Sequence, residues 1–183
     1  APAGQRNRLT KQLAAALLDA LNMLDPGSDR QRSAARAFAY LGQGTEGVAA
    51  ELTLLLAGDT ASALSPGLEI DDELKWLLLT SLASLGRIDV ERLQRELAAS
   101  HTATNELRYR TALAALPEPA RQAQLWQEVF DGTDTKGNAL SNAAVTAAAT
   151  GLKASGNLKG TDRLQVLLEG LTTIWSSRSN NLA

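Results

Sequence analysis

The chain is built from leucine-striped segments bounded by helix caps, and this pattern limits its fold more than any other feature. Apolar residues recur every three or four positions almost throughout, the spacing of helices buried on one side. Among 183 residues, Leu (33) and Ala (32) together outnumber Val (5) and Ile (3) about eightfold. Leu and Ala favour helices, whereas strands draw on β-branched and aromatic residues. We therefore expect an all-α fold.

Capping residues divide the chain into about nine expected helices. Ser28 with Gln31 three residues later forms a capping box. Other starts carry a single N-cap residue or an initial proline: Thr45, Asp71, Asp89, Thr102, Pro119 and Ser141. Gly42, Gly58 and Gly86 follow apolar stripes and are expected to end helices. The expected helices cover residues 9–24, 28–42, 45–58, 71–86, 89–97, 102–116, 119–129, 141–148 and 161–175.

Short connections between these segments predict that consecutive helices pack antiparallel. Helix starts recur irregularly, about 13–26 residues apart, a spacing similar to degenerate helix-pair repeats of the HEAT type. We therefore expect a curved array of about nine antiparallel helices, a HEAT-like irregular α-solenoid, forming a single module over 1–183. The opening Ala1–Gly4 has neither an initiator Met nor a signal region, so we interpret the module as excised from a longer chain.

Composition argues against several classes of function. The chain has no cysteine and one histidine, which rules out thiol catalysis, iron–sulfur clusters and a two-histidine metal site within one copy. A formal charge of −2 argues against nucleic-acid binding, and no apolar run approaches the ~20 residues that cross a membrane. The lack of cysteine and of Asn-x-Ser/Thr sequons favours a cytoplasmic location.

Several polar residues could form sites, but their sequence context favours structural roles. His101 precedes a helix without a nucleophile or ligand at useful spacing, so we expect an ordinary interhelical histidine. The run Asp71-Asp72-Glu73 is expected to serve a helix N-terminus, and the acidic stretch between Ala37 and Leu74, which lacks Lys and Arg, a solvated surface.

Glycines and tryptophans receive similar interpretations. The glycines around Lys153 and Lys159 do not follow the order of a phosphate-binding loop, so we expect a glycine-rich interhelical loop at Gly151, Gly156 and Gly160. Trp76, Trp126 and Trp175 lie on or beside apolar stripes and are expected to pack between helices. The sequence thus predicts no catalytic, cofactor-binding or metal-ligating residue in this chain.

Three ordered sets of residues resemble a known family. The first is Asp25–Asp29 with Gln31 and Arg36–Ala39. The second is Leu56–Gly58, Pro66–Asp71, Leu74–Trp76 and Leu82–Gly86. The third is Glu96-Leu97, Thr102, Ala112–Pro117, Trp126, Leu140–Asn142 and Gly151. Together they resemble the C-terminal helical domain of actinobacterial-type aminopeptidase N, among the zinc-dependent gluzincin aminopeptidases, over about residues 2–178.

The resemblance implies that this chain has a non-catalytic role in an enzyme. In such enzymes one zinc ion, held by His-Glu-x-x-His and a further Glu in a thermolysin-like domain, serves the removal of N-terminal residues from peptides. Neither that motif nor Gly-x-Met-Glu-Asn occurs here, so no catalytic position is carried over. The implied partners are the catalytic domain of the same polypeptide and its peptide substrates, with no nucleic acid and no membrane. The implied role is to enclose the peptide chamber and limit substrate size.

An alternative stays open. A free-standing helical-repeat scaffold would bind a protein partner along its concave face. An upstream catalytic domain carrying zinc favours the aminopeptidase interpretation, whereas a stable protein partner favours the scaffold.

Overall fold

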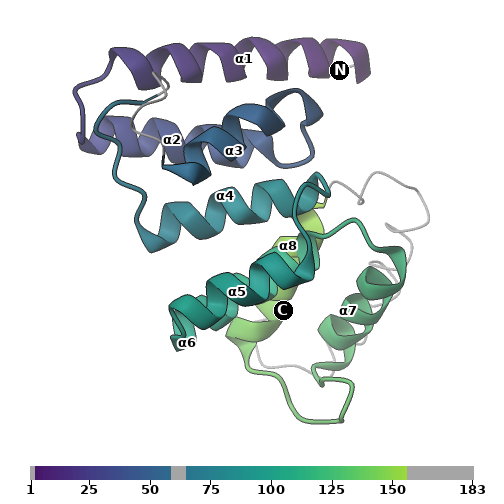
Figure 1. The fold of residues 1–183 in the computed structure, drawn as a ribbon. Helices are drawn as coiled ribbons and strands as arrows, with labels where there is room; N and C mark the ends of the chain where they lie inside the picture. The colour runs from purple at the N-terminus through teal and green to yellow at the C-terminus, as the bar shows by residue number, and fades with distance from the viewer. Residues whose placement is uncertain (1–2, 59–64, 156–183) are drawn as a thin grey trace. The chain divides into compact units, whose positions relative to one another are not determined.

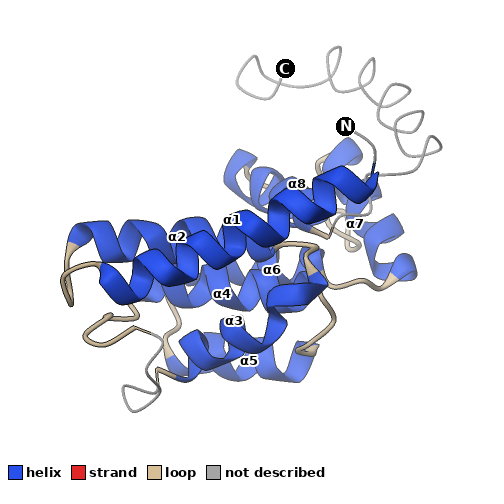
Figure 2. Cartoon of the chain, turned by 90° about the horizontal axis from the view of Figure 1, so that it is seen from above, coloured by secondary structure: helices blue, strands red, loops and turns tan. Residues whose placement is uncertain are grey.

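The computed structural model describes residues 3–58 and 65–155, which form helices joined by short connections (Figure 1). These ranges contain no strand, only an isolated bridge between Thr133 and Ala139, so the all-α prediction is confirmed there (Figure 2). The expected helix at 161–175 lies outside the described residues. The described helices are α1 (Ala3–Met23), α2 (Asp29–Gly42), the 3-10 helix η1 (Glu46–Val48), α3 (Ala49–Ala57), α4 (Asp72–Ser84), α5 (Val90–Ala99), α6 (Ala103–Ala115), α7 (Pro119–Asp131) and α8 (Asn142–Ala154).

The contacts divide the chain into two compact units, Ala1–Ile88 and Asp89–Ala183. In the first unit α1 packs on α2, and both α2 and α3 pack on α4. Their shared core is aliphatic apart from Phe38, which is fully buried. Its buried members are Ala14, Leu21, Ala35, Phe38, Ala39, Val48, Leu52, Leu55, Leu68, Leu74, Leu78, Leu82 and Leu85.

The second unit is organised around α8. This helix packs against both α6 and α7, and α5 packs against α6. The main pair, α6 with α8, is therefore not consecutive in sequence, although the consecutive pairs α5–α6 and α7–α8 also pack together. Small side chains make this pairing possible, because Ala114 and Ala148 are fully buried in the core that also holds Leu125, Val129 and Leu152.

Most helix starts were correctly predicted because capping is a local interaction. The side chains of five predicted N-caps accept a hydrogen bond from the backbone N–H three residues later. These residues are Ser28, Asp71, Asp89, Thr102 and Ser141. Pro119 is the first residue of α7, as expected. Gly58 and Gly86, with φ of 62° and 63°, end α3 and α4 as predicted.

The connection between α2 and α3 differs from the prediction. Gly42 is the buried last residue of α2, where a Cβ would come within 2.7 Å of Leu52 Cδ1, and the positive φ of 67° belongs to Gly44. Thr45 does not begin an α-helix, because η1 intervenes and α3 starts at Ala49. Gly42 therefore leaves room for the Leu52 side chain of α3, and Gly44 supplies the turn.

Helix α1 also departs from the predicted pattern. The sequence predicts one buried stripe through Leu9, Leu13 and the leucines that follow, but Leu9 and Leu13 are 59% and 53% exposed. Only the later part of the predicted stripe faces the core. The core-facing residues of α1 are Ala14, Leu17, Leu18 and Leu21.

Candidate functional site

The acidic run at the start of α4 is a helix cap joined to ion pairs. Asp71 Oδ1 accepts a hydrogen bond from the Leu74 N–H at 2.7 Å, which is the N-cap interaction predicted for it. Arg36 of α2 donates to Asp71 Oδ2 at 3.1 Å and to Glu73 Oε2 at 3.0 Å. These carboxylates therefore serve the helix N-terminus and tie α4 to α2.

The neighbouring Arg32 extends this charged surface along α2. It pairs with Asp29 one turn earlier and lies 3.9 Å from Glu69 Oε2. The hydrogen bond from Arg32 holds the pKa of Asp29 below its ordinary value, and Asp29 in turn raises the pKa of Arg32. The acidic stretch is thus partly neutralised by two arginines from α2, which the sequence alone did not indicate.

Gln31 is a buried polar side chain of the first unit with three hydrogen-bond partners. It is fully buried, its Oε1 accepts from the Gly27 N–H at 2.8 Å, and its Nε2 donates to Leu21 O at 3.2 Å and to Pro66 O at 3.1 Å. The predicted capping box is therefore only half formed: Ser28 accepts from the Gln31 N–H, but the Gln31 side chain reaches Gly27 and two distant carbonyls. Its role is to hold three chain segments together.

His101 lies in the connection between α5 and α6, as expected. It is exposed, and its Nε2 lies 3.1 Å from Glu106 Oε1, in the first turns of α6. This carboxylate partner was not predicted from the sequence. Glu106 comes close to His101 because α6 begins directly after Thr102. An exposed pair of this kind provides neither a nucleophile nor a set of metal ligands.

The glycine-rich interpretation of Gly151 is wrong, because this residue lies inside α8 and is buried. Lys153 is exposed in the last turn of the same helix. Gly156, Lys159 and Gly160 lie outside the described residues.

The tryptophans that the structure describes lie in different units. Trp76 of α4 is 2% exposed, and Trp126 of α7 is half-buried and stacks on Phe130 with ring centroids 5.7 Å apart. Both are consistent with the packing role that we expected. Trp175 lies outside the described residues.

The second unit contains a mostly buried ion pair that sequence analysis did not find. Arg110 of α6 binds Glu128 of α7, and Gln124 donates to the other oxygen of that carboxylate at 3.1 Å. Glu128 is 8% exposed, so its charge depends on these two partners. Arg110 and Glu128 are 18 residues apart, so no local sequence pattern could predict that they pair.

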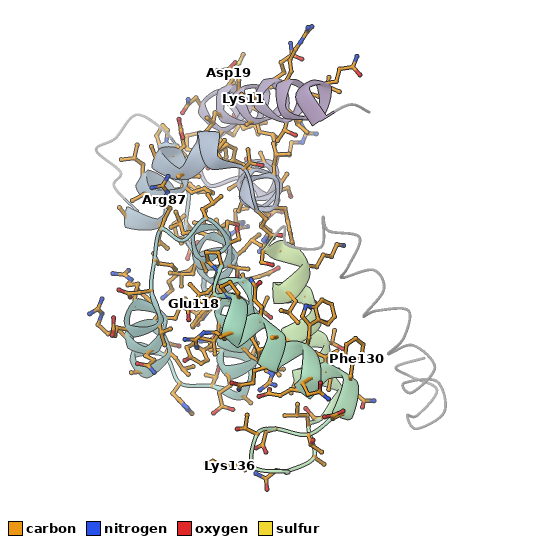
Figure 3. The ribbon with its side chains drawn as sticks, turned by 90° about the vertical axis from the view of Figure 1, so that its right-hand side faces the viewer. Lys11, Asp19, Arg87, Glu118, Phe130 and Lys136 are labelled. Atoms are coloured by element: carbon orange, nitrogen blue, oxygen red, sulfur yellow. The ribbon has the colours of Figure 1, made fainter. Side chains whose placement is uncertain are left out.

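The loop after α7 is closed by one aspartate. Asp134 accepts hydrogen bonds from Asn138 Nδ2 at 2.9 Å and from the backbone N–H groups of Asn138 and Lys136 at 2.9 and 2.8 Å. The Asn138 side chain contributes most to lowering the pKa of Asp134, followed by the Asn138 N–H. Figure 3 shows Lys136 at the tip of this loop, pointing away from the helices. The loop is held by its own hydrogen bonds.

These features share no geometry for catalysis. The part of the chain that the structure describes brings together no group of three or more His, Cys, Asp or Glu side chains able to hold a metal ion. None of the described helices combines the length and hydropathy required to cross a bilayer. What the described residues offer are helix surfaces, charged contacts between helices and a packed apolar interior.

Comparison of the sequence with known proteins identifies the family of this chain. The sequence model of a family described as the ERAP1-like C-terminal domain matches residues 2–182. The chain is also 31% identical over 190 residues to an aminopeptidase N from Streptomyces lividans, in an alignment that covers 100% of the chain and 20% of that protein. The chain thus spans about a fifth of the length of this curated relative. Since the family match runs over nearly all of its residues, the chain belongs to the family of ERAP1-like C-terminal domains.

Proposed function

We propose that this chain is the non-catalytic C-terminal module of a zinc-dependent aminopeptidase N. In this proposal the module encloses the peptide chamber and limits substrate size, while a catalytic domain elsewhere in the polypeptide removes N-terminal residues. The observation that carries the proposal is the family match over residues 2–182, supported by identity to an aminopeptidase N along the whole chain. That relative is about five times longer than the stretch matched here, which leaves room for a separate catalytic domain.

The described residues do not fit a zinc site. A catalytic zinc ion usually takes three protein ligands and keeps one position for water. His101 lies beside Glu106, and the carboxylates at the start of α4 are engaged with Arg36 and with the helix N-terminus. No group of three possible ligands forms among the described residues. We therefore assign the zinc ion of the proposed enzyme to its catalytic domain and derive no chemical step from this chain.

The proposed role of the module is exclusion and positioning. A wall of packed helices admits flexible peptides and keeps folded proteins away from the reacting groups. Enclosure also restricts the orientations of a bound peptide, and orientation accounts for a large part of enzymatic rate enhancement. A single module over 1–183 with the curved, HEAT-like arrangement expected from the sequence would suit this role, as would a cytoplasmic enzyme that processes peptides.

The test is removal of the module from the full-length enzyme. We expect the truncated enzyme to retain its zinc and to keep most of its activity on a single-residue anilide. Its relative activity on long and short peptides should change, because only the longer peptides extend into the space that the module encloses. Turnover of a peptide series of increasing length, divided by anilide turnover, measures this preference.

Zinc content and monodispersity are the controls, since an exposed apolar surface can reduce solubility and imitate lost catalysis. Adding the module back as a separate chain should restore the original preference. A zinc-loaded, monodisperse truncated enzyme with an unchanged length preference would refute the chamber role. A stable complex of the module with an unrelated protein would instead favour a scaffold.

A further inference from the structure

Helix α1 carries an apolar stripe that faces away from the core of its own unit. Leu9, Leu13 and Met23 are 59%, 53% and 85% exposed, three of the five large apolar side chains exposed among the described residues. Ala16 is exposed and Ala20 half-buried at the positions between them. At about 100° per residue, these five side chains lie along one line of the helix, about 21 Å long.

The stripe is distinct from the face that α1 buries. Ala14 and Leu21 contact the core, and helix geometry places them roughly 120–140° around the axis from Leu9. Figures 1 and 2 show α1 as the outermost helix of the first unit, with α2 and α3 on one side of it and none of the unit's other described helices covering the opposite side. Helix α1 therefore has two apolar faces, and the described residues of its unit cover only one of them.

Helix α5 provides a comparison, because its solvent-exposed face differs in composition from the exposed stripe of α1. Helix α5 buries Leu93 and exposes Glu91, Gln94 and Arg95 together with Ala98 and Ala99, so its outer face carries no large apolar side chain. In arrays of stacked helices the terminal elements need such polar outer faces, because nothing covers them. The outer stripe of α1 has the composition of an internal contact.

We propose that this stripe seats a further amphipathic helix of the same polypeptide, one that lies outside these 183 residues. The inference rests on the proposed function, in which the chain is one part of a longer aminopeptidase. The matched relative supports such an occupant, because four-fifths of its length lie outside the alignment with this chain.

The size of the stripe favours a tethered helix over a second copy of the chain. A strip about 21 Å long and about 10 Å wide covers roughly 200 Å². A typical specific complex buries about 800 Å² on each partner, so the strip alone would not hold a homodimer. A segment of the same polypeptide associates at a high effective concentration and needs less contact area.

Charges on one edge of the stripe define the chemistry of the partner. Arg8 and Asp19 are both exposed on this edge, about 16 Å apart along the helix, and Figure 3 shows Asp19 on the outer side of α1. A helix seated on the stripe would place leucine-like side chains against Leu9 and Leu13. It would carry an acidic residue opposite Arg8 and a basic residue opposite Asp19.

Cysteine labelling tests the proposal without relying on activity. The chain contains no cysteine, so Leu13→Cys introduces one thiol into it, and other cysteines of the full-length polypeptide can be replaced beforehand. Ala15→Cys is the matched control, because Ala15 is exposed on the same helix outside the stripe. The rate of maleimide labelling is measured for each variant in the native full-length polypeptide, in the same polypeptide unfolded in urea, and in the 183-residue chain.

We expect the thiol of Leu13→Cys to react at least tenfold more slowly in the native full-length polypeptide than in urea, and to react freely in the 183-residue chain. The thiol of Ala15→Cys should react freely in all three. Free labelling of Leu13→Cys in the full-length polypeptide would overturn the proposal. Slow labelling of the Leu13→Cys thiol in the monomeric 183-residue chain would overturn the proposal and indicate that the chain's own residues beyond 155 cover the stripe. Slow labelling only in a dimer would overturn it and indicate that a second copy covers the stripe. Unchanged peptide-length preference after truncation would refute the chamber role and leave these labelling results unaffected.

Discussion

Gly151 of α8 lies directly against the backbone of Thr111 in α6. A Cβ at Gly151 would come 2.0 Å from the Thr111 carbonyl oxygen and 2.7 Å from Ala114 Cβ. Backbone atoms cannot move aside as a flexible side chain can, so a side chain at position 151 would force the two helices apart.

Gly151→Ala should therefore destabilise the second unit, although alanine favours helices by about 1 kcal/mol over glycine. Overpacking of a filled contact costs about 1–3 kcal/mol and here exceeds that gain. Urea unfolding followed by far-ultraviolet circular dichroism measures the change. The control Thr150→Ala, at an exposed position of the same helix, should leave stability within about 0.5 kcal/mol. A Gly151→Ala variant more stable than the original chain would show that α6 and α8 do not approach this closely.

Gln31→Leu should destabilise the first unit by about 2 kcal/mol, because it leaves the buried Leu21 carbonyl and the part-buried Gly27 N–H and Pro66 carbonyl without their hydrogen-bond partner. Ser28→Ala provides the comparison, since it removes only the helix cap and should cost about 1 kcal/mol. Denaturant unfolding of both variants measures the difference. Equal effects of the two substitutions would mean that the distant contacts of Gln31 contribute nothing.

Arg110→Met should destabilise the second unit by about 2 kcal/mol at neutral pH, since it leaves the Glu128 carboxylate mostly buried without its cation. The double variant Arg110→Met/Glu128→Met should recover much of this loss, because no charge then remains unpaired. A double-mutant cycle in urea gives the coupling between the two residues. Additive effects of the two single variants would contradict the pairing.

The pKa of Asp134 should lie below its ordinary value and should rise in Asn138→Ala, which removes the largest contribution to the shift. Because the folded state lowers the pKa of Asp134, the interaction stabilises the fold above the ordinary aspartate pKa of about 3.9, and that contribution is lost as pH falls through the lower folded-state pKa. Asp134→Asn should thus differ from the original chain at neutral pH and converge with it in acid. Carboxyl NMR titration measures the pKa directly, and an Asp134 pKa insensitive to Asn138→Ala would refute this account.

The helix starts could be predicted from the sequence because they depend on local interactions. Features that depend on contacts between distant residues could not be predicted. Ser28, Asp71 and Thr102 could be identified as caps because each bonds to a backbone group three residues away. The glycine at 151 suggested a loop, because glycine is a poor helix former and its reason for being there, Thr111, lies 40 residues earlier in the chain.

The polar contacts follow the same rule. No pattern in the sequence links Gln31 to Pro66 or Arg110 to Glu128, since each pair depends on how helices meet. The outer stripe of α1 was missed for a related reason. Leu9 and Leu21 recur at helical spacing, but only their positions around the helix axis, relative to α2, decide which of them is buried.

The pairing of α6 with α8 across the intervening α7 has a consequence during synthesis on the ribosome. Helix α6 leaves the exit tunnel well before α8 exists, so the alanine surface that receives Gly151 has no native partner during that interval. Proteins emerge at about 5–20 residues per second, so α6 waits a few seconds for the residues of α8. Its small side chains expose little apolar area during this wait, and an α6 surface of leucines would give chaperones and neighbouring nascent chains far more to bind.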